Sequence, residues 1–221
     1  MGNLILVRHA PTDASASGHN LGQRSDPPLS AAGAARAAAL GPTLALELAA
    51  LGCAELRLLT SPARRCRETL AGLAAGIGAQ NVEARVESSL LEIDYGAWEG
   101  LTAEESRERD PQLRASWDAD PYATAAPGGE SGADVARRAF ATLAPLESWL
   151  AGDRSRCAVV VSHNHVVRLR LAALIGIALP DYRRLITADP GGYSIVTLST
   201  GHPTIRRLNC LPRAEPDSAS A

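Results

Sequence analysis

The sequence predicts an α/β fold: a three-layer sandwich in which a mostly parallel central sheet is flanked by helices. Short apolar runs rich in β-branched residues, typical of buried strands, alternate along the chain with longer Ala- and Leu-rich segments typical of helices. Polar side chains directly follow several of the short runs. Because parallel strands bring their carboxyl ends to one edge of a sheet, the same alternation predicts where a functional site lies.

The predicted strands are apolar runs bounded by polar or turn-forming residues. They cover residues 3–8, 56–60, 82–86, 157–162, 193–199 and 204–209. The last two flank Thr200-Gly201-His202-Pro203, a turn sequence that indicates an antiparallel hairpin at one edge of the sheet. The others are separated by helical segments, as the strands of a parallel sheet are.

The predicted helices lie between the strands and cover residues 30–51, 62–76, 102–108, 130–151 and 164–175. The first two are rich in Ala, the residue with the highest helix propensity. In the second we expect Ser61 as the N-cap and Pro62 in the first turn. Several arginines surround the N-terminus of this helix, whose free N–H groups also favour an anion.

Residues 1–211 are predicted to form a single domain. Within it, residues 110–129 carry several Pro and Asp residues with little periodicity, which predicts a lid over the site where the substrate is selected. Residues 212–221, composed mainly of Pro, Ser, Ala and acidic residues, are predicted to be a disordered tail.

Composition narrows the class of protein. The chain has 221 residues, is 46% hydrophobic and carries a formal net charge of −2, which fits a soluble enzyme and argues against nucleic-acid or membrane partners. No apolar segment is long enough for a transmembrane helix, and the N-terminus lacks the pattern of a signal peptide. We therefore expect a cytoplasmic protein, and the sequence leaves a homodimer open.

An Arg-His pair and a second histidine follow two of the predicted strands. Arg8-His9 comes directly after the first strand, and His163 comes directly after the strand that ends at Ser162. An arginine fork binds two phosphate oxygens at once, and a neutral imidazole nitrogen can attack phosphorus. A strand-end Arg-His pair alone fits a surface role equally well, but polar residues suited to the same chemistry also follow other apolar segments, and this recurrence favours a phosphate site.

A run of residues from Glu92 to Gly100 contains three carboxylates beside a turn. The leaving oxygen of a phosphate ester needs a proton at neutral pH, so a carboxylic acid with a raised pKa is expected, and Glu92 is the candidate. Asp94 is an alternative acid. Glu99 fits a solvated turn carboxylate better.

Taken in order, six motifs resemble those of the histidine phosphatase superfamily, the group that includes the cofactor-dependent phosphoglycerate mutases. They are Arg8-His9-Ala10, Asp26 to Gly33, Ser61-Pro62-Ala63-Arg64-Arg65, Glu92 to Gly100, Gly128-Gly129-Glu130-Ser131 and Val161-Ser162-His163. The resemblance covers roughly residues 3–175 and implies a phosphoglycerate mutase-like version of the predicted fold.

The resemblance also implies roles for individual residues. His9 corresponds to the nucleophile, Glu92 to the proton donor, and Arg8, Arg65 and His163 to groups that bind the phosphate. The second arginine of the motif falls on Arg65 and not on Arg64.

At two positions the chain departs from the family pattern. Ser15 stands where many members have an Asn that touches the phosphate, and we include Ser15 as a candidate phosphate-binding residue. Asn164 and His165 follow the second histidine, where a Gly is usual.

These residue types predict a phosphomonoesterase that works through a phosphohistidine. His9 would attack phosphorus, and water would later cleave the intermediate, so that two easier steps replace a very slow one. His163, as a cation or as a donor tautomer, would add a contact to the phosphoryl group. Because arginines supply the positive charge, we expect neither a metal nor another cofactor. The expected ligand is a small phosphorylated metabolite.

Other functions remain open at this point. The pair His163-x-His165 could suggest a metal site, although these residues span the change from strand to helix. Within the family, a phosphoglycerate mutase is an alternative, but the segment between Glu92 and His163 is shorter than mutases tend to have. An α-ribazole phosphatase of cobalamin synthesis is another. A non-catalytic phosphate-binding module is the alternative outside the enzymes.

We expect packing or surface roles for several neighbouring residues. Arg64 and Arg67 should point into solvent from the helix surface, Trp98 should anchor the packing of its turn, and His19 and His202 should be ordinary loop residues.

Overall fold

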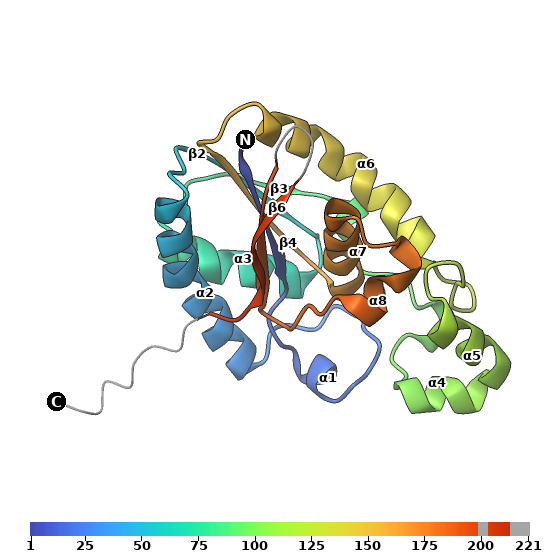
Figure 1. Cartoon of the computed structure of the whole chain (residues 1–221). Coiled ribbons are helices and arrows are strands. Elements are labelled where there is room, and N and C mark those ends of the chain that lie inside the picture. Colours follow the sequence, from blue (N-terminus) through green and yellow to red (C-terminus); the bar gives the residue numbers. More distant parts are fainter. Residues whose placement is uncertain (199–202, 213–221) are drawn as a thin grey trace.

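The computed structural model describes residues 1–198 and 203–212, and in this part of the chain a six-stranded sheet lies between two layers of helices (Figure 1). The strands are β1 (Asn3–Arg8), β2 (Glu55–Thr60), β3 (Ala84–Val86), β4 (Arg156–Ser162), β5 (Tyr193–Thr197) and β6 (Thr204–Cys210). Their order across the sheet is β3-β2-β4-β1-β5-β6. The three-layer α/β prediction is confirmed.

The sheet is mostly parallel, as the alternation of strands and helices predicts. β1 and β2 each pair in parallel with β4, and β3 pairs in parallel with β2. β5 runs antiparallel to both β1 and β6, which confirms an antiparallel pair at one edge. Residues 199–202 of the predicted turn, with His202, lie outside the described residues.

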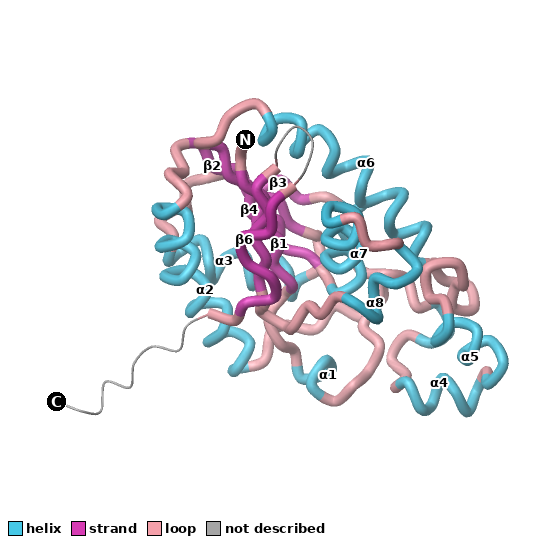
Figure 2. Tube along the Cα trace, viewed as in Figure 1, coloured by secondary structure: helices cyan, strands magenta, loops and turns pink. Residues whose placement is uncertain are grey.

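Helices cover both faces of the sheet (Figure 2). α2 (Ala31–Ala50) and α3 (Arg64–Gly76) pack together on one face, and α6 (Gly132–Ala151) and α7 (Asn164–Ile175) pack together on the other. In the described part of the chain, none of these helices is both long and apolar enough to cross a membrane.

The core consists of two clusters because side chains of the central strands alternate between the faces. On β1, Leu4 and Leu6 pack in the cluster on the α6 side, whereas Ile5 and Val7 pack in the cluster on the α2 side. All four side chains are fully buried. A strand buried on both faces reads as a continuous apolar run, which is the pattern that the sequence shows.

Short helices connect these elements. They are α1 (Asp13–Ala16), η1 (Ser88–Leu90), η2 (Gly96–Trp98), α4 (Ala103–Arg109), α5 (Pro111–Ala119), η3 (Leu179–Asp181) and α8 (Tyr182–Leu185). Figure 1 shows α4 and α5 together, to one side of the sheet.

The irregular structure expected at residues 110–129 is wrong in part, because helix α5 occupies their first half. Pro111 is the first residue of α5, a position where proline favours a helix and does not break it. Arg114 and Trp117 form its buried side. The role of this segment as a lid stays a prediction, and the predicted tail falls outside the described residues from position 213 onward.

The segment that carries α4 and α5 begins and ends at one narrow neck. The N–H of Ala97 donates to the Pro127 carbonyl at 2.8 Å, and the N–H of Glu130 donates to the Asp94 carbonyl at 2.8 Å. A Cβ atom on Gly96 would lie 2.1 Å from the Pro127 oxygen. Only glycine, which also accepts the observed φ of 51°, fits at this crossing.

Candidate active site

The carboxyl ends of β1, β4 and β2 bring three polar residues together. Arg8 lies opposite Ser162 in the parallel register of β1 and β4, so His9 and His163 leave the sheet side by side. Their ring centroids are 5.3 Å apart in an edge-to-face arrangement. Ser61 follows β2, the other neighbour of β4, and its hydroxyl lies 2.8 Å from Nε2 of His163.

His9 is buried in its neutral form, with Nε2 as the basic nitrogen. Its Nδ1 lies 2.8 Å from the carbonyl of Ala10, an acceptor, so the proton sits on Nδ1. Burial, with Arg8 and Arg65 nearby, lowers the pKa of His9 to about 3. A neutral imidazole with a free Nε2 lone pair is the form that a nucleophile needs.

Arg65 is almost fully buried and is held by backbone carbonyls. Its Nη1 donates to the Ser25 carbonyl at 3.1 Å, and Nη2 donates to the Gly22 carbonyl at 2.9 Å. Nη2 also lies 3.2 Å from Nδ1 of His163. Within the described residues its Nε–H has no partner, and Nη1 lies 3.9 Å from Oδ1 of Asp26.

Arg8, the residue before His9, has a similar environment. Its Nη1 donates to the Ala188 carbonyl at 2.7 Å, and its buried Nε–H has no partner among residues 1–198 and 203–212. Buried donors in native proteins are nearly always bonded. Two guanidinium groups with such donors, together with a neutral imidazole, are chemically suited to bind a tetrahedral dianion.

Ser61 is not the N-cap of α3, and the expectation that it is was wrong. The helix begins at Arg64 after Ala63, and the Ser61 hydroxyl instead accepts from the Ala63 N–H at 3.3 Å and contacts His163. The Arg64 N–H at the start of the helix donates to Asp26 at 2.6 Å, so a carboxylate of the chain itself occupies this end of α3.

The ring nitrogens of His163 are both engaged. Because an arginine only donates, Nδ1 accepts from Arg65 and Nε2 carries the proton that goes to Ser61. Burial and the charge of Arg65 hold the pKa of His163 well below its ordinary value. Of the two forms considered for His163, the ligand-free site therefore favours the neutral tautomer over the cation.

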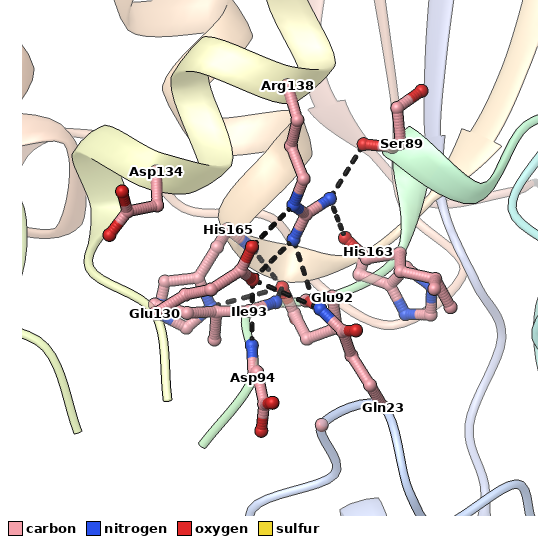
Figure 3. Close-up of polar contacts among 12 residues, drawn as sticks. Gln23, Ser89, Glu92, Ile93, Asp94, Glu130, Asp134, Arg138, His163 and His165 are labelled. Carbon is pink, nitrogen blue, oxygen red and sulfur yellow. Dashed lines mark hydrogen bonds and ion pairs between the residues drawn. The ribbon is translucent and has the colours of Figure 1, made fainter. Parts of the chain in front are cut away.

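Glu92 is buried at the N-terminus of α7. Its Oε1 accepts from the backbone N–H groups of Ile93, at 3.0 Å, and His165, at 3.2 Å, and lies 3.2 Å from Nδ1 of His165. Its charge raises the pKa values of His9 and His163, against the larger opposite effect of burial. Figure 3 shows Glu92 among the polar residues that surround it.

The raised pKa expected for Glu92 is not found in the structure. Burial alone raises the pKa of a carboxyl group, but the contacts with His165 and the Ile93 N–H outweigh it and hold the pKa of Glu92 below its ordinary value. Groups that donate a hydrogen bond to a carboxylate stabilise its charged form and so lower its pKa. A phosphate dianion bound nearby acts in the opposite direction, because like charges favour the protonated acid.

An ion pair between Glu130 and Arg138 supports the backbone around Glu92 (Figure 3). Arg138 donates to both oxygens of Glu130 at 2.8 Å and to the carbonyls of Ser89, at 2.6 Å, Leu91, at 2.7 Å, and Glu92, at 2.9 Å. One guanidinium thus fixes the carbonyls on both sides of the turn that carries Glu92.

Glu99 is not a solvated turn carboxylate, as the sequence suggests, but an anchor for the loop beside Arg65. It accepts from three successive N–H groups, of Gln23 at 3.1 Å, Arg24 at 2.7 Å and Ser25 at 2.5 Å. The side chain of Gln23 reaches on to the Glu92 carbonyl at 2.8 Å. This loop therefore supports both residues, because its Ser25 carbonyl accepts from Arg65 and its Gln23 side chain donates to the Glu92 carbonyl.

Ser15 and Asp94 serve the backbone in this structure. The Ser15 hydroxyl donates to the Thr12 carbonyl at 2.8 Å and accepts from the Thr12 N–H at 2.9 Å. The Asp94 carboxylate accepts from the Gly96 N–H at 2.7 Å, within its own turn. The structure brings neither side chain into contact with His9, whereas the His163 ring packs against it and the charges of Arg8, Arg65 and Glu92 act on its pKa.

The surface and packing residues lie where the sequence predicts. Arg64 forms an exposed ion pair with Glu68 at 2.6 Å, and Arg67 is exposed. Trp98 is fully buried. The exposed ring of His19 lies 2.8 Å from the hydroxyl of Ser17, a neighbour in the same loop.

Sequence reasoning missed Gln23, Arg138 and the contact between His165 and Glu92. The Gly-Glu-Ser motif does point to Glu130, but nothing in the sequence selects Arg138 over Arg137 as its partner. Among the described residues, no group of three His, Cys, Asp or Glu side chains is placed to hold a metal ion. His163 and His165 also have different neighbours, Ser61 for one and Glu92 for the other.

Comparison with known sequences identifies related proteins over most of the chain. The model of the histidine phosphatase superfamily (branch 1) matches residues 4–211. Phosphoserine phosphatase 1 of Hydrogenobacter thermophilus is 31% identical over 95% of this chain and 92% of its own. Glucosyl-3-phosphoglycerate phosphatase of Mycobacterium tuberculosis is 31% identical over 82% of this chain and 79% of its own.

Comparison with solved structures confirms the phosphoglycerate mutase-like fold. The α-ribazole phosphatase from Shigella flexneri superposes with a TM-score of 0.78, covers 97% of this chain and 100% of its own, and is 23% identical. At this identity the likeness shows the fold alone.

Proposed function

The chain belongs to the histidine phosphatase superfamily and is a phosphoric monoester hydrolase of small phosphorylated metabolites; from this premise we propose that it works through a phosphohistidine on His9. The observation that carries this proposal is the state of His9. The ring is neutral, its proton is fixed on Nδ1 by the Ala10 carbonyl, and Nε2 has no hydrogen-bond partner among residues 1–198 and 203–212.

Arg8, Arg65 and His163 bind the phosphoryl group. The unpartnered Nε–H groups of both arginines supply donors, and their charge neutralises the oxygens as the transition state forms. The carbonyls that hold Arg65 fix its guanidinium before the substrate arrives, so little reorganisation is needed. We leave Ser15 out of this set because its hydroxyl caps α1.

In the first step Nε2 of His9 attacks phosphorus, and the ester P–O bond breaks. Glu92, protonated in the complex, gives its proton to the leaving oxygen, so the alcohol departs neutral. In the second step water attacks the phosphohistidine, its proton goes to the Glu92 carboxylate, and the P–N bond breaks. Phosphate is released with His9 neutral and Glu92 protonated again. None of these transfers requires a metal ion.

Trapping the phosphoenzyme tests the proposal. Brief incubation with ³²P-labelled substrate and a rapid quench should give a phosphoprotein that is labile in acid and stable in base, as a phosphohistidine is. His9→Ala should abolish it. His19→Ala, which changes an exposed histidine of the neighbouring loop, serves as the matched control and should leave the yield unchanged. A phosphoprotein of undiminished yield in His9→Ala would remove His9 from this role.

The substrate is a small phosphorylated metabolite. The relatives named above act on phosphoserine and on glucosyl-3-phosphoglycerate, and the family resemblance adds α-ribazole phosphate. A screen of these compounds, sugar phosphates and 3-phosphoglycerate by kcat/KM identifies the preferred ester. The same screen, with 3-phosphoglycerate followed by product analysis, separates hydrolysis from a mutase reaction. We propose a cytoplasmic enzyme with neither nucleic acid nor membrane as a partner, in keeping with its net charge of −2.

A further inference from the structure

His165 approaches Glu92 with two of its groups. Its backbone N–H donates to Oε1 of Glu92 at 3.2 Å, and its ring Nδ1 lies 3.2 Å from the same oxygen. His165 is the second residue of α7, whose first N–H groups have no partner within the helix. A carboxylate at this end of a helix is stabilised by the free N–H groups and by the helix dipole.

The ring of His165 lies in a closed aromatic box. Its side chain is 1% exposed, and its centroid is 5.7 Å from Tyr95, 6.2 Å from Trp117 and 5.8 Å from Tyr182. These three residues come from three different segments of the chain. Neither ring nitrogen has a hydrogen bond of good geometry to any described residue, which is costly for a buried imidazole.

The charged groups around this box determine the state of the ring. Glu92 attracts a proton to it, whereas Arg168, on the same helix, and Arg183, stacked 4.4 Å over the Trp117 ring, oppose one. Burial opposes it too, and together these effects lower the pKa of His165 below its ordinary value. The ring is therefore neutral and carries one N–H group. Oε1 of Glu92, 3.2 Å from Nδ1, is the acceptor that this N–H can reach by a small rotation.

We propose that His165 is a positioning residue that holds Oε1 of Glu92 and so leaves Oε2 as the oxygen that donates the proton to the leaving group. The inference rests on the proposed role of Glu92. Three contacts converge on Oε1, from Ile93 and from two groups of His165, whereas Oε2 receives no hydrogen bond from the described residues. When the ester bond breaks, the Oε2–H bond breaks and the leaving oxygen takes that proton. Oε1 stays bonded to His165 throughout.

The test compares two substrates across matched variants. His165→Phe keeps a ring in the box but removes the ring N–H, whereas His165→Asn places an amide N–H close to the position of Nδ1. On an alkyl phosphate, kcat of His165→Phe should fall about tenfold further than on p-nitrophenyl phosphate, because the variant cannot form the proposed hydrogen bond from the ring N–H to Oε1. The alkaline limb of the kcat profile should move to higher pH, because the carboxylate loses a donor. His165→Asn should restore both.

Controls separate positioning from packing. Tyr182→Phe removes a buried polar group from the same box without touching Glu92 and should show no dependence on the leaving group. In a Glu92→Gln background, His165→Phe should add no further selectivity, because it acts through the missing acid. Melting temperatures check the fold, and His165→Leu replaces the Phe variant if that one does not fold.

The outcomes also distinguish this inference from the proposed function. A selective loss in Glu92→Gln together with equal losses on both substrates in His165→Phe overturns the inference and leaves Glu92 as the acid. Added selectivity in the double variant overturns it as well. An unselective Glu92→Gln overturns the role of Glu92 and this inference with it, while trapping of the phosphoenzyme reports on His9 independently of both.

Discussion

The guanidinium of Arg138 forms two hydrogen bonds of 2.8 Å with the carboxylate of Glu130 and uses its other N–H groups to hold the backbone that carries Glu92. The ion pair is partly buried, with the side chains 20% and 23% exposed. Its geometry depends on the planar fork of arginine, which an ammonium group cannot reproduce.

Arg138→Lys should therefore reduce kcat while the charge is kept. A misplaced acid costs up to about 100-fold in kcat, and we expect a loss of that order with little change in KM, because the phosphate ligands are untouched. Steady-state kinetics on an alkyl phosphate measures it. Arg137→Lys is the matched control, since the contact that Arg137 makes within the described residues is an exposed ion pair with Asp134. Equal kinetics in the two variants would contradict the positioning role.

Arg65 and Arg64 are neighbours with opposite environments, and their truncation should have very different effects. Arg65→Ala removes a preorganised donor to the phosphoryl group and should cost about 3 kcal/mol or more of transition-state stabilisation, measured as kcat/KM. His163→Ala should show a loss of the same order. Arg64→Ala breaks an exposed ion pair and should change kcat/KM little. A larger loss at Arg64 would show that the assignment of the second arginine is off by one residue.

The pH profile should identify Glu92 as the acid. The pKa of Glu92 is below its ordinary value in the free enzyme and rises when a phosphate dianion binds, so the protonated acid, and with it kcat on alkyl phosphates, is lost as pH rises. Glu92→Gln should remove this alkaline limb and lower kcat on an alkyl phosphate about 100-fold or more. On p-nitrophenyl phosphate, whose leaving group departs without help, the loss should be small.

Asp94→Asn is the control for this assignment. The Asp94 carboxylate caps its own turn through the Gly96 N–H, so its loss should affect both substrates alike. A loss at Asp94 that depends on the leaving group would transfer the role of acid from Glu92 to Asp94.

Activity should not depend on a divalent cation. The positive charge of the site comes from Arg8 and Arg65, which a chelator does not remove. We expect unchanged kcat/KM after dialysis against EDTA and no gain on adding Mg²⁺ or Zn²⁺. An enzyme inactivated by EDTA and restored by one of these ions would bring back a metal site that includes His163 and His165.

Much of the framework could be predicted from the sequence because it depends on local patterns. Apolar runs of four or five residues identify the central strands. A polar residue directly after a parallel strand lies at the carboxyl edge of the sheet, so Arg8, His9 and His163 meet as predicted. The Ser-Pro motif also selects Arg65 over Arg64, and the structure buries the first and exposes the second.

The remainder depends on tertiary contacts that carry no local signal. From the sequence, Glu99 has the pattern of a solvated turn carboxylate. Its partners, the N–H groups of residues 23–25, are far away in the sequence and are brought to it by the fold. The pKa direction of Glu92 was wrong for the same reason. Burial predicts a raised value, but His165, seventy-three positions away, contributes a donor that reverses it. Helix α5 was missed because Pro111 begins the helix, whereas proline more often interrupts one.

The segment with α4 and α5 can be replaced as a unit, because its two ends meet at the neck formed by Asp94, Ala97, Pro127 and Glu130. Its two ends are bonded to each other by backbone groups at 2.8 Å. Two side chains inside the segment still support the site, because Trp117 packs against the ring of His165 and Glu99 holds the loop beside Arg65. We expect a graft of the corresponding segment from a relative to transfer substrate preference, with the phosphoenzyme chemistry retained, provided that these two contacts are kept.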